Sequence, residues 1–484
     1  MNIKIISRNV GYALLVSALF MFLSVLVSLL NGRDSALAAL SISFLITFIT
    51  GAFPFIFVRK SPAMTLRDGY MIIILSWVLS FIFGMLPYVL WGGPFTVINA
   101  WFESVSGFTT TGSSILEKVE ALPDSLLFWR SSTHFIGGLG VVVFLMLIIP
   151  SSSPVKLRLT NVELSSLSKD GYRVRANKTV SIFTYVYIGL AVAATLCYYL
   201  AGMSFFDAVN HAFSVCATGG FSTRTLSIGA FASPAINIIT IVFMILGSVH
   251  FGLIFLVLVS RSIRPLKNPV LKYYLTSIVT VSLIIAFSLK MSGTELTWGG
   301  AVMKGFFQVS AYSSTTGFAI ADNSLWPMLP CVLLMFVGMQ CGMAGSTTGG
   351  LKCDRVIYLF KAVGRQVHRS INPASVTSIR VGGRYFSDEE IFPHIVYIAL
   401  FLLLILLSTV LCLMFGASGG DALTGTISSL ANVGPALGDI GSAGNYNGIP
   451  SMVKFLFSLD MLLGRLEIYP VMAVLMMIFR RNRK

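Results

Sequence analysis

Charged residues are scarce in this chain of 484 residues, and the two signs are unequal. Asp, Glu, Lys and Arg make up 11% of the residues, hydrophobic residues make up 55%, and the mean hydropathy is +0.84. Soluble globular domains carry about 25% charged residues, so the composition excludes that class. The sequence instead predicts an all-α, polytopic membrane protein.

The residues that build most metal and redox sites are also few. The five histidines form no HExxH pattern, and the six cysteines form no CxxC pair. We therefore expect no enzymatic activity, no bound cofactor and no disulfide framework. The cysteines should be free, packed thiols: Cys197, Cys216, Cys331, Cys341, Cys353 and Cys412.

Long apolar runs, in contrast, are abundant. About 20 apolar residues are needed for a helix to cross a bilayer. Ten runs are predicted to do so: 10–30, 37–58, 70–91, 131–150, 179–201, 232–259, 272–290, 326–343, 391–415 and 451–479. The first is longer than the apolar core of a signal peptide, so we expect it to be retained.

The charge distribution predicts the orientation. With a cytoplasmic N-terminus, the inner segments hold 26 of the 34 Lys and Arg residues, the outer segments hold seven, and Arg465 lies within a span. Cytoplasmic loops are enriched in basic residues, which explains the net charge of +15 without nucleic acid binding. Both termini are predicted to be cytoplasmic. The basic segment 165–178 also suits a partner protein or anionic lipid.

Four short polar segments repeat along the chain, each between two apolar runs. They align on a glycine and read TTGS at 110–113, TGGF at 218–221, TTGF at 315–318 and NVGP at 432–435. A half-apolar stretch of about ten residues, too short to cross a bilayer, precedes each one. Small residues stand six positions before the glycines: Ser106, Ser214, Ala311 and Ser428.

This repetition predicts four re-entrant loops around a common axis. Irregular backbone survives at membrane depth only where it is buried in protein or lines a water-filled cavity. Four glycine-containing loops can direct backbone carbonyls toward a dehydrated monovalent cation. The alternative interpretation is that the loops are ordinary outer turns between helices.

The repeats, together with GMAGSTTGGLK at 342–352 and GRLEIYP at 464–470, resemble the superfamily of potassium transporters that includes the TrkH, KtrB and plant HKT proteins. The N-terminal pair of apolar runs favours the TrkH branch. The resemblance covers the whole chain and implies four M1-P-M2 repeats around a pseudo-fourfold pore. It divides the chain into an N-terminal hairpin (1–66) and repeats at 67–155, 156–268, 269–385 and 386–484.

The resemblance also implies roles for individual residues. Potassium, the transported ion, would meet a selectivity filter formed by Thr110, Thr111, Gly112, Thr218, Gly219, Gly220, Thr315, Thr316, Gly317, Asn432, Val433 and Gly434. The fourth loop departs from the Thr-Thr-Gly pattern. A second hypothesis is transport of sodium or of monovalent cations in general, but relatives that prefer sodium carry Ser where this chain has Gly112. A third is a membrane-embedded enzyme or substrate carrier.

The segment 345–352 invites two interpretations besides the one that the family implies. It differs from a nucleotide-binding P-loop because Leu351 separates Gly350 from Lys352. It could also be a plain turn that ends a helix. In the family, the segment resembles an intramembrane loop that lies under the filter as a gate. The gate residues would be Gly345, Ser346, Thr347, Thr348, Gly349 and Gly350.

Arg465 is predicted to lie near the middle of the membrane, where a charge is costly. It precedes Arg480 by 15 residues, or about 22 Å of helix, which is too far for its side chain to reach the cytoplasm. It either faces the pore as a brake on cations or forms a static pair with Glu467 or Asp460. The resemblance favours the pore.

The family resemblance further implies partners and a location. We expect a homodimer in the bacterial inner membrane, in contact with a cytosolic, nucleotide-binding regulatory subunit of the TrkA type. The helical stripe in residues 354–369 is either packed against the chain's own helices or part of these contacts.

Overall fold

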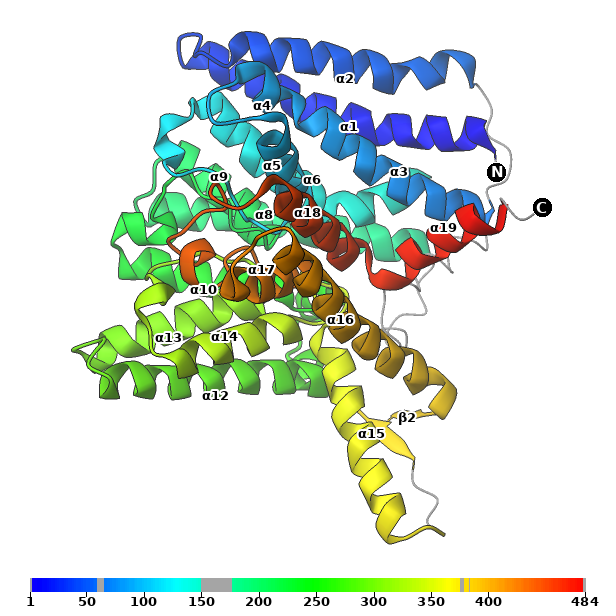
Figure 1. Cartoon of the computed structure of the whole chain (residues 1–484), viewed down its shortest axis with the longest axis vertical. Coiled ribbons are helices and arrows are strands. Elements are labelled where there is room, and N and C mark those ends of the chain that lie inside the picture. Colours follow the sequence, from blue (N-terminus) through cyan, green and yellow to red (C-terminus); the bar gives the residue numbers. More distant parts are fainter. Residues whose placement is uncertain (1, 59–64, 149–175, 375–377, 383, 482–484) are drawn as a thin grey trace.

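The computed structural model describes residues 2–58, 65–148, 176–374, 378–382 and 384–481, which include most of the chain (Figure 1). The first half of this part contains α1 (Ile3–Leu30), α2 (Leu37–Phe57), α3 (Leu66–Gly84), α4 (Leu86–Trp91), α5 (Val97–Phe108), α6 (Asp124–Ile148), α8 (Ala176–Leu200), α9 (Phe205–Cys216), α10 (Pro234–Ser248) and α11 (Phe251–Ser260). The second half contains α12 (Pro269–Met291), α13 (Trp298–Ser313), α14 (Met328–Gln340), α15 (Cys353–Ile371), β1 (Ile379–Val381), β2 (Arg384–Phe386), α16 (Asp388–Met414), α17 (Gly419–Ala431), α18 (Ser451–Leu466) and α19 (Ile468–Arg481).

The N-terminal helices α1 and α2 form an antiparallel hairpin along one side of the molecule (Figure 1). Glycines let the two backbones approach, because a Cβ on Gly11 would lie 2.6 Å from the carbonyl oxygen of Gly51. The hydroxyls of Ser43 and Thr47 donate to carbonyls one turn earlier, so these buried polar groups are satisfied within α2. The hairpin packs against α3 and α6.

Four short helices, α5, α9, α13 and α17, match the predicted half-helices. They contain 12, 12, 16 and 13 residues, which at about 1.5 Å per residue is less than a bilayer needs. Each begins with a hydroxyl side chain that accepts from a backbone N–H in the first turn. The four N-cap residues are Thr96, Ser204, Thr297 and Ser418.

The prediction of ten continuous spans needs correction. Among the described residues, six helices are long and apolar enough to cross a membrane: α1, α2, α3 with α4, α8, α12 and α16. The predicted span 232–259 is instead the pair α10 and α11, bent by 102°, which becomes a seventh span if it is counted as one. The span at 326–343 is a helix of 13 residues, and the span at 451–479 is divided between α18 and α19. The last residues of the span at 131–150 lie outside the described part.

A contact with a distant segment, a local helix cap and a left-handed residue accompany these breaks. At the first one, the carbonyl of Ser248 accepts from the backbone N–H of Met343, and His250 caps the next helix by accepting from Gly252 N. At the last one, Glu467 adopts a φ of +62°, which ends α18. Hydropathy records composition only, so it predicts the apolar runs and misses these interruptions.

The helix α15 projects from the helical body at the bottom of the view, and α1 begins and α19 ends at the right edge of the body (Figure 1). Beyond α15, the antiparallel strands β1 and β2 pair Ile379 with Phe386 and Val381 with Arg384. This small hairpin was not predicted, and it qualifies the all-α description. The predicted basic segment at 165–178 lies largely outside the described residues.

Candidate functional site

The four short helices end in the same hydrogen-bonded turn. In each, the residue two positions before the aligned glycine has a φ between +53° and +57° and donates its N–H to the carbonyl three residues earlier, at 3.1 or 3.2 Å. The next residue donates to the carbonyl five residues earlier at 2.9 Å. This pair of bonds is the Schellman motif. The carbonyls that accept the second bond belong to the small residues noted in the sequence: Ser106, Ser214, Ala311 and Ser428.

Threonine is an unusual choice for the left-handed position of this motif. The residues there are Thr110, Thr218, Thr315 and Asn432. A β-branched residue with positive φ is a true outlier, and the conformation costs about 1–3 kcal/mol. Asparagine enters this region more readily. The departure of the fourth loop from the Thr-Thr-Gly pattern therefore preserves the shared backbone shape.

The glycines of the four loops meet in a closed ring. Gly112, Gly220, Gly317 and Gly434 have φ values of +84°, +84°, +68° and +102°. Around the ring, the Cβ that each would carry lies 2.0, 1.9, 2.2 and 2.4 Å from a carbonyl oxygen of the next loop. These oxygens belong to Gly219, Thr316, Val433 and Thr111. No side chain fits at any of the four positions, and the fourth loop returns to the first. Separate outer turns would not produce this closure.

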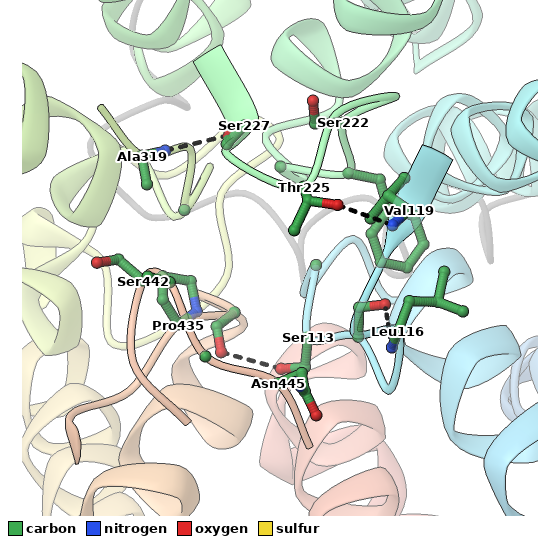
Figure 2. A pocket seen from close by; sticks show the side chains of 18 of the residues that line it. Ser113, Leu116, Val119, Ser222, Thr225, Ser227, Ala319, Pro435, Ser442 and Asn445 are labelled. Atoms are coloured by element: carbon green, nitrogen blue, oxygen red, sulfur yellow. Dashed lines mark hydrogen bonds between the residues drawn. The ribbon is translucent and has the colours of Figure 1, made fainter. Parts of the chain in front are cut away.

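A pocket opens directly outside the ring, and all four glycines line it (Figure 2). Bonds between loops hold its wall: the Ser113 hydroxyl donates to Gly434 O at 3.0 Å, and Ala319 N donates to Ser227 Oγ at 3.2 Å. The phenol of Tyr446 also donates to Gly434 O, at 2.8 Å. The pocket therefore leads from the surface to the ring.

The segment between α14 and α15 lies against the helix ends on the other side of the ring. The Thr347 hydroxyl donates to the carbonyl of Cys216 at 3.1 Å, and Gly349 N donates to Thr315 Oγ1 at 3.4 Å. A Cβ on Gly349 would lie 2.5 Å from Asn432 Oδ1. The residues predicted as a gate, 345–350, thus contact the inner ends of the second, third and fourth loops.

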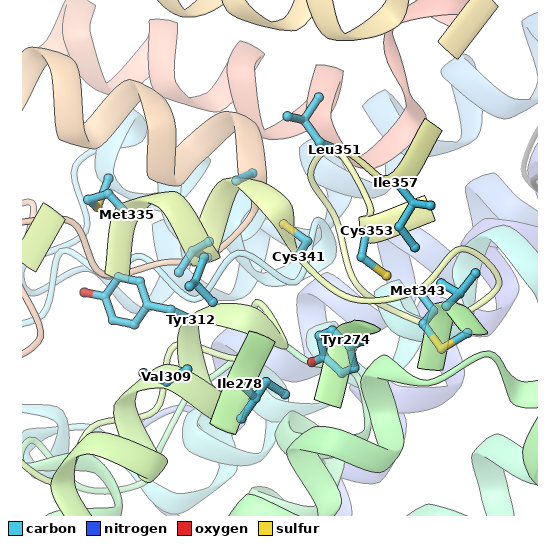
Figure 3. Close-up of a cluster of buried hydrophobic side chains, with 14 of the residues drawn as sticks. Tyr274, Ile278, Val309, Tyr312, Met335, Cys341, Met343, Leu351, Cys353 and Ile357 are labelled. Carbon is cyan, nitrogen blue, oxygen red and sulfur yellow. The ribbon is translucent and has the colours of Figure 1, made fainter. Parts of the chain in front are cut away.

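Apolar packing anchors both ends of this segment. Met343, Leu351 and Cys353 lie in a buried cluster with Tyr274 and side chains of the third repeat (Figure 3). The backbone of the segment is also bonded to the break between α10 and α11, because Phe251 N donates to Gly345 O at 3.0 Å. The middle of the segment, by comparison, consists of Gly, Ser and Thr.

Arg465, near the end of α18, holds this segment from the opposite side. Its guanidinium donates to the carbonyl of Thr347 and, at 2.9 Å, to the carbonyl of Gly137 in α6. The arginine therefore bridges the segment between α14 and α15 and the helix α6. The contacts described above join the segment directly to the second, third and fourth predicted repeats. Arg465 adds a link to the first, through Gly137.

The two acids considered as partners of Arg465 are engaged elsewhere. Glu467 accepts from Arg355 at 2.8 Å and lies 3.8 Å from the ammonium of Lys352. The carboxyl of Asp460 accepts from the Ser408 hydroxyl at 2.5 Å. The static-pair alternative therefore finds no support in these contacts.

Sequence reasoning missed one charged pair near the ring. Glu103 and Arg130 were counted as charges of the outer segments, yet they are only 0% and 2% exposed and are paired at 2.8 Å. The available signal was Glu103 itself, a carboxylate in the middle of the half-apolar stretch 98–108. The six cysteines are free, as predicted, and all but Cys197 are buried.

Comparison with known proteins agrees with this architecture. The model of a family described as "TrkH: Cation transport protein" matches residues 37–480. Trk system potassium uptake proteins TrkH from Escherichia coli (strain K12) and Halomonas elongata are 31% and 33% identical over 490 and 486 residues, with full coverage of both chains. The crystal structure of the potassium transporter TrkH from Vibrio parahaemolyticus has a TM-score of 0.88 at 30% identity, covering 98% of this chain and 99% of that one. This chain belongs to the TrkH family of cation transport proteins.

Proposed function

We propose that this protein takes up potassium across a membrane through the path enclosed by the four glycine loops. The observation that carries the proposal is the closed ring in which each glycine faces a carbonyl of the next loop. Backbone carbonyls can replace the hydration shell of a potassium ion. Relatives that match the whole chain are named potassium uptake proteins, which supports the same ion.

The filter in this proposal consists of the three residues that end at each glycine. Glycine is needed where the loops touch, and the residues before it present carbonyls to the ion. Potassium is the transported substrate. A ring without side chains suits an ion that moves through, because binding must be weak enough for the ion to leave.

The proposed gate is the segment 345–350 together with Arg465. The segment lies against the inner ends of three loops, and the guanidinium holds it through the Thr347 carbonyl. A fixed positive charge beside the path opposes the passage of cations. Opening requires the arginine to release the segment or to move with it.

The proposed setting is the bacterial inner membrane, with both termini in the cytoplasm. The basic residues of α15 and the excess of basic residues in the predicted inner segments support this orientation. We further propose a homodimer and a regulatory subunit of the TrkA type. The projecting helix α15 supports such contacts, because it exposes Phe360, Val363, Val367 and Ile371.

Ion flux into proteoliposomes tests the proposal. Purified protein should admit rubidium, a potassium analogue, faster than sodium, and external potassium should compete with the rubidium. If rubidium and sodium entered at equal rates, the proposal of potassium uptake would be rejected in favour of transport of monovalent cations in general. Repeating the measurement with an imposed proton gradient distinguishes a channel from a proton-coupled carrier, because only the carrier should respond beyond the effect of the membrane potential.

A further inference from the structure

A buried ion pair lies beside the outer end of the proposed filter. Glu103, on α5, is 0% exposed, and Arg130, on α6, is 2% exposed. The guanidinium Nε donates to the carboxylate Oε1 at 2.8 Å. Two charges are kept out of water in this way only when the geometry satisfies both of them. Their partners therefore indicate what the pair holds in place.

The carboxylate of Glu103 binds the segment that follows the first filter glycine. It accepts from the Ser114 hydroxyl at 2.9 Å and from the backbone N–H of Ile115 at 3.1 Å. Ser114 stands two residues after Gly112 and lines the outer pocket. The carboxylate thus fixes the residues that follow the first loop's glycine to α5, the short helix that precedes the loop.

The guanidinium of Arg130 extends the contact to the second loop. It donates to the carbonyl of Ser222 at 3.2 Å, two residues after Gly220. Its central carbon lies 4.0 Å from the ring centroid of Phe221, and another nitrogen donates to the Ser114 hydroxyl at 3.2 Å. The pair therefore joins equivalent points of two neighbouring loops through charge-assisted hydrogen bonds.

The equivalent positions of the other repeats carry different side chains. Nine residues before the aligned glycines stand Glu103, His211, Gln308 and Gly425. His211 bonds the Ser222 hydroxyl at 2.8 Å, and Gln308 donates to the carbonyl of Ala321 at 3.1 Å. Gly425 carries no side chain, and Phe457 occupies the adjacent space. Of these four positions, only the first carries a carboxylate.

We propose that Glu103 and Arg130 are positioning residues for ion selectivity. They set the separation between the first and second loops at the outer end of the filter, and neither needs to touch the ion. Distances held by a buried, charge-assisted network are more rigid than those held by single neutral bonds. The inference rests on the proposed filter, and it adds that discrimination between potassium and sodium depends on this pair.

The test compares selectivity with folded yield. The variant Glu103→Gln/Arg130→Met removes both charges, so no buried charge is left unpaired. We expect at least a threefold lower ratio of rubidium to sodium uptake in proteoliposomes, with a monodisperse protein on size-exclusion chromatography. Arg130→Lys keeps the charge but loses the planar fork, and it should give an intermediate ratio. Glu295→Gln removes the outer partner of Lys304, away from the pocket, and should leave the ratio unchanged.

A wild-type ratio in the folded double variant would overturn the proposal. If that variant does not fold, Arg130→Lys decides in its place: a lowered ratio supports the proposal, and an unchanged ratio overturns it. Gly112→Ser is measured in parallel. If it lowers the ratio while the pair variants do not, only the role of the pair is wrong. If neither lowers it, the filter assignment itself is wrong.

Discussion

The backbone conformations of a few individual residues in the four loops set the shape of the candidate ion path. Three threonines occupy the left-handed position of a Schellman motif, where glycine would remove the strain. Two residues farther along, the glycines of the four loops occupy positions where a Cβ would collide with a neighbouring loop. Sequence spacing predicted these glycines because the motif repeats. It could not predict that Asn432 preserves the shared turn, because φ values are not visible in residue identity alone.

Replacing a ring glycine should reduce selectivity. Serine at position 112 would place its Cβ about 2.0 Å from the carbonyl oxygen of Gly219, so the ring must distort or widen. We expect Gly112→Ser to lower the ratio of rubidium to sodium uptake severalfold. Gly189→Ser is the matched control, because Gly189 has open space around it. Unchanged ratios in both Gly112→Ser and Gly317→Ser would refute the filter assignment.

Removing the guanidinium of Arg465 should increase flux. Hydrogen bonds to charged groups contribute about 1.5–3 kcal/mol each, so losing the contact to the Thr347 carbonyl should raise rubidium uptake by roughly tenfold or more. Arg465→Ala should keep its selectivity, because the proposed filter lies on the other side of the proposed gate segment.

The double variant Arg465→Ala/Glu467→Gln is measured beside the single one. Glu467 has Arg355 as a partner, so the single variant should retain its folded yield. A low yield that the second substitution restores, without any gain in flux, would show that Arg465 is a structural charge.

At the scale of elements, the helices that follow the second, third and fourth polar loops are interrupted. These breaks, at α10/α11, after α14 and at α18/α19, distinguish this fold from a simple bundle. The half-helices, their polar loops and the first helices of the repeats were predictable from hydropathy and spacing. The bend after Ser248 and the end of α14 were not, because they depend on hydrogen bonds between distant segments, such as Met343 N to Ser248 O at 2.9 Å. The buried pair of Glu103 and Arg130 was missed for the same reason.

Deleting residues 345–350 should raise basal flux. The segment lies against the inner ends of three of the glycine loops, so its removal should clear the proposed path. Thr347→Ala is the matched control. It removes the hydroxyl bonds to Cys216 and Gly247 but keeps the carbonyl that Arg465 holds, so the increase should be smaller. Loss of uptake by a correctly inserted deletion variant would instead indicate a structural role.

At the scale of the whole molecule, the exposed apolar side chains of α15 differ in their setting from those of the long apolar helices. Those on α2, α8, α12 and α16 suit contact with lipid, because these helices are long enough to cross a membrane. Those on α15 lie on a projecting helix that is not among the described helices apolar enough to cross a membrane (Figure 1). This difference supports α15 as a protein contact. The sequence predicted the helical stripe in residues 354–369 but left open whether it packs within the chain or against a partner, because residue spacing does not show which face stays exposed.

A charge on this face should weaken the proposed dimer. Val363 and Val367 are 52% and 55% exposed, and an aspartate at either position would have to be desolvated in an apolar contact. We expect Val363→Asp/Val367→Asp to shift the purified protein from dimer to monomer in light scattering. Lys361→Asp places the same residue on another side of α15, about 100° from Phe360, and should leave the mass unchanged. A dimer that persists in the double variant would place the contact elsewhere.

The acceptors of Arg465 have a consequence for natural variation. Both are main-chain oxygens, of Thr347 and Gly137, and every residue type supplies such an oxygen. Exchanges at position 347 therefore leave the acceptor in place, so homologues can diverge there without losing the contact. Position 137 has no such freedom, because a Cβ there would lie 1.8 Å from Phe108 O. Across aligned homologues, Arg465 and Gly137 should be nearly invariant, while residue 347 should vary between Thr and Ser, which both keep the hydroxyl that bonds Cys216 and Gly247.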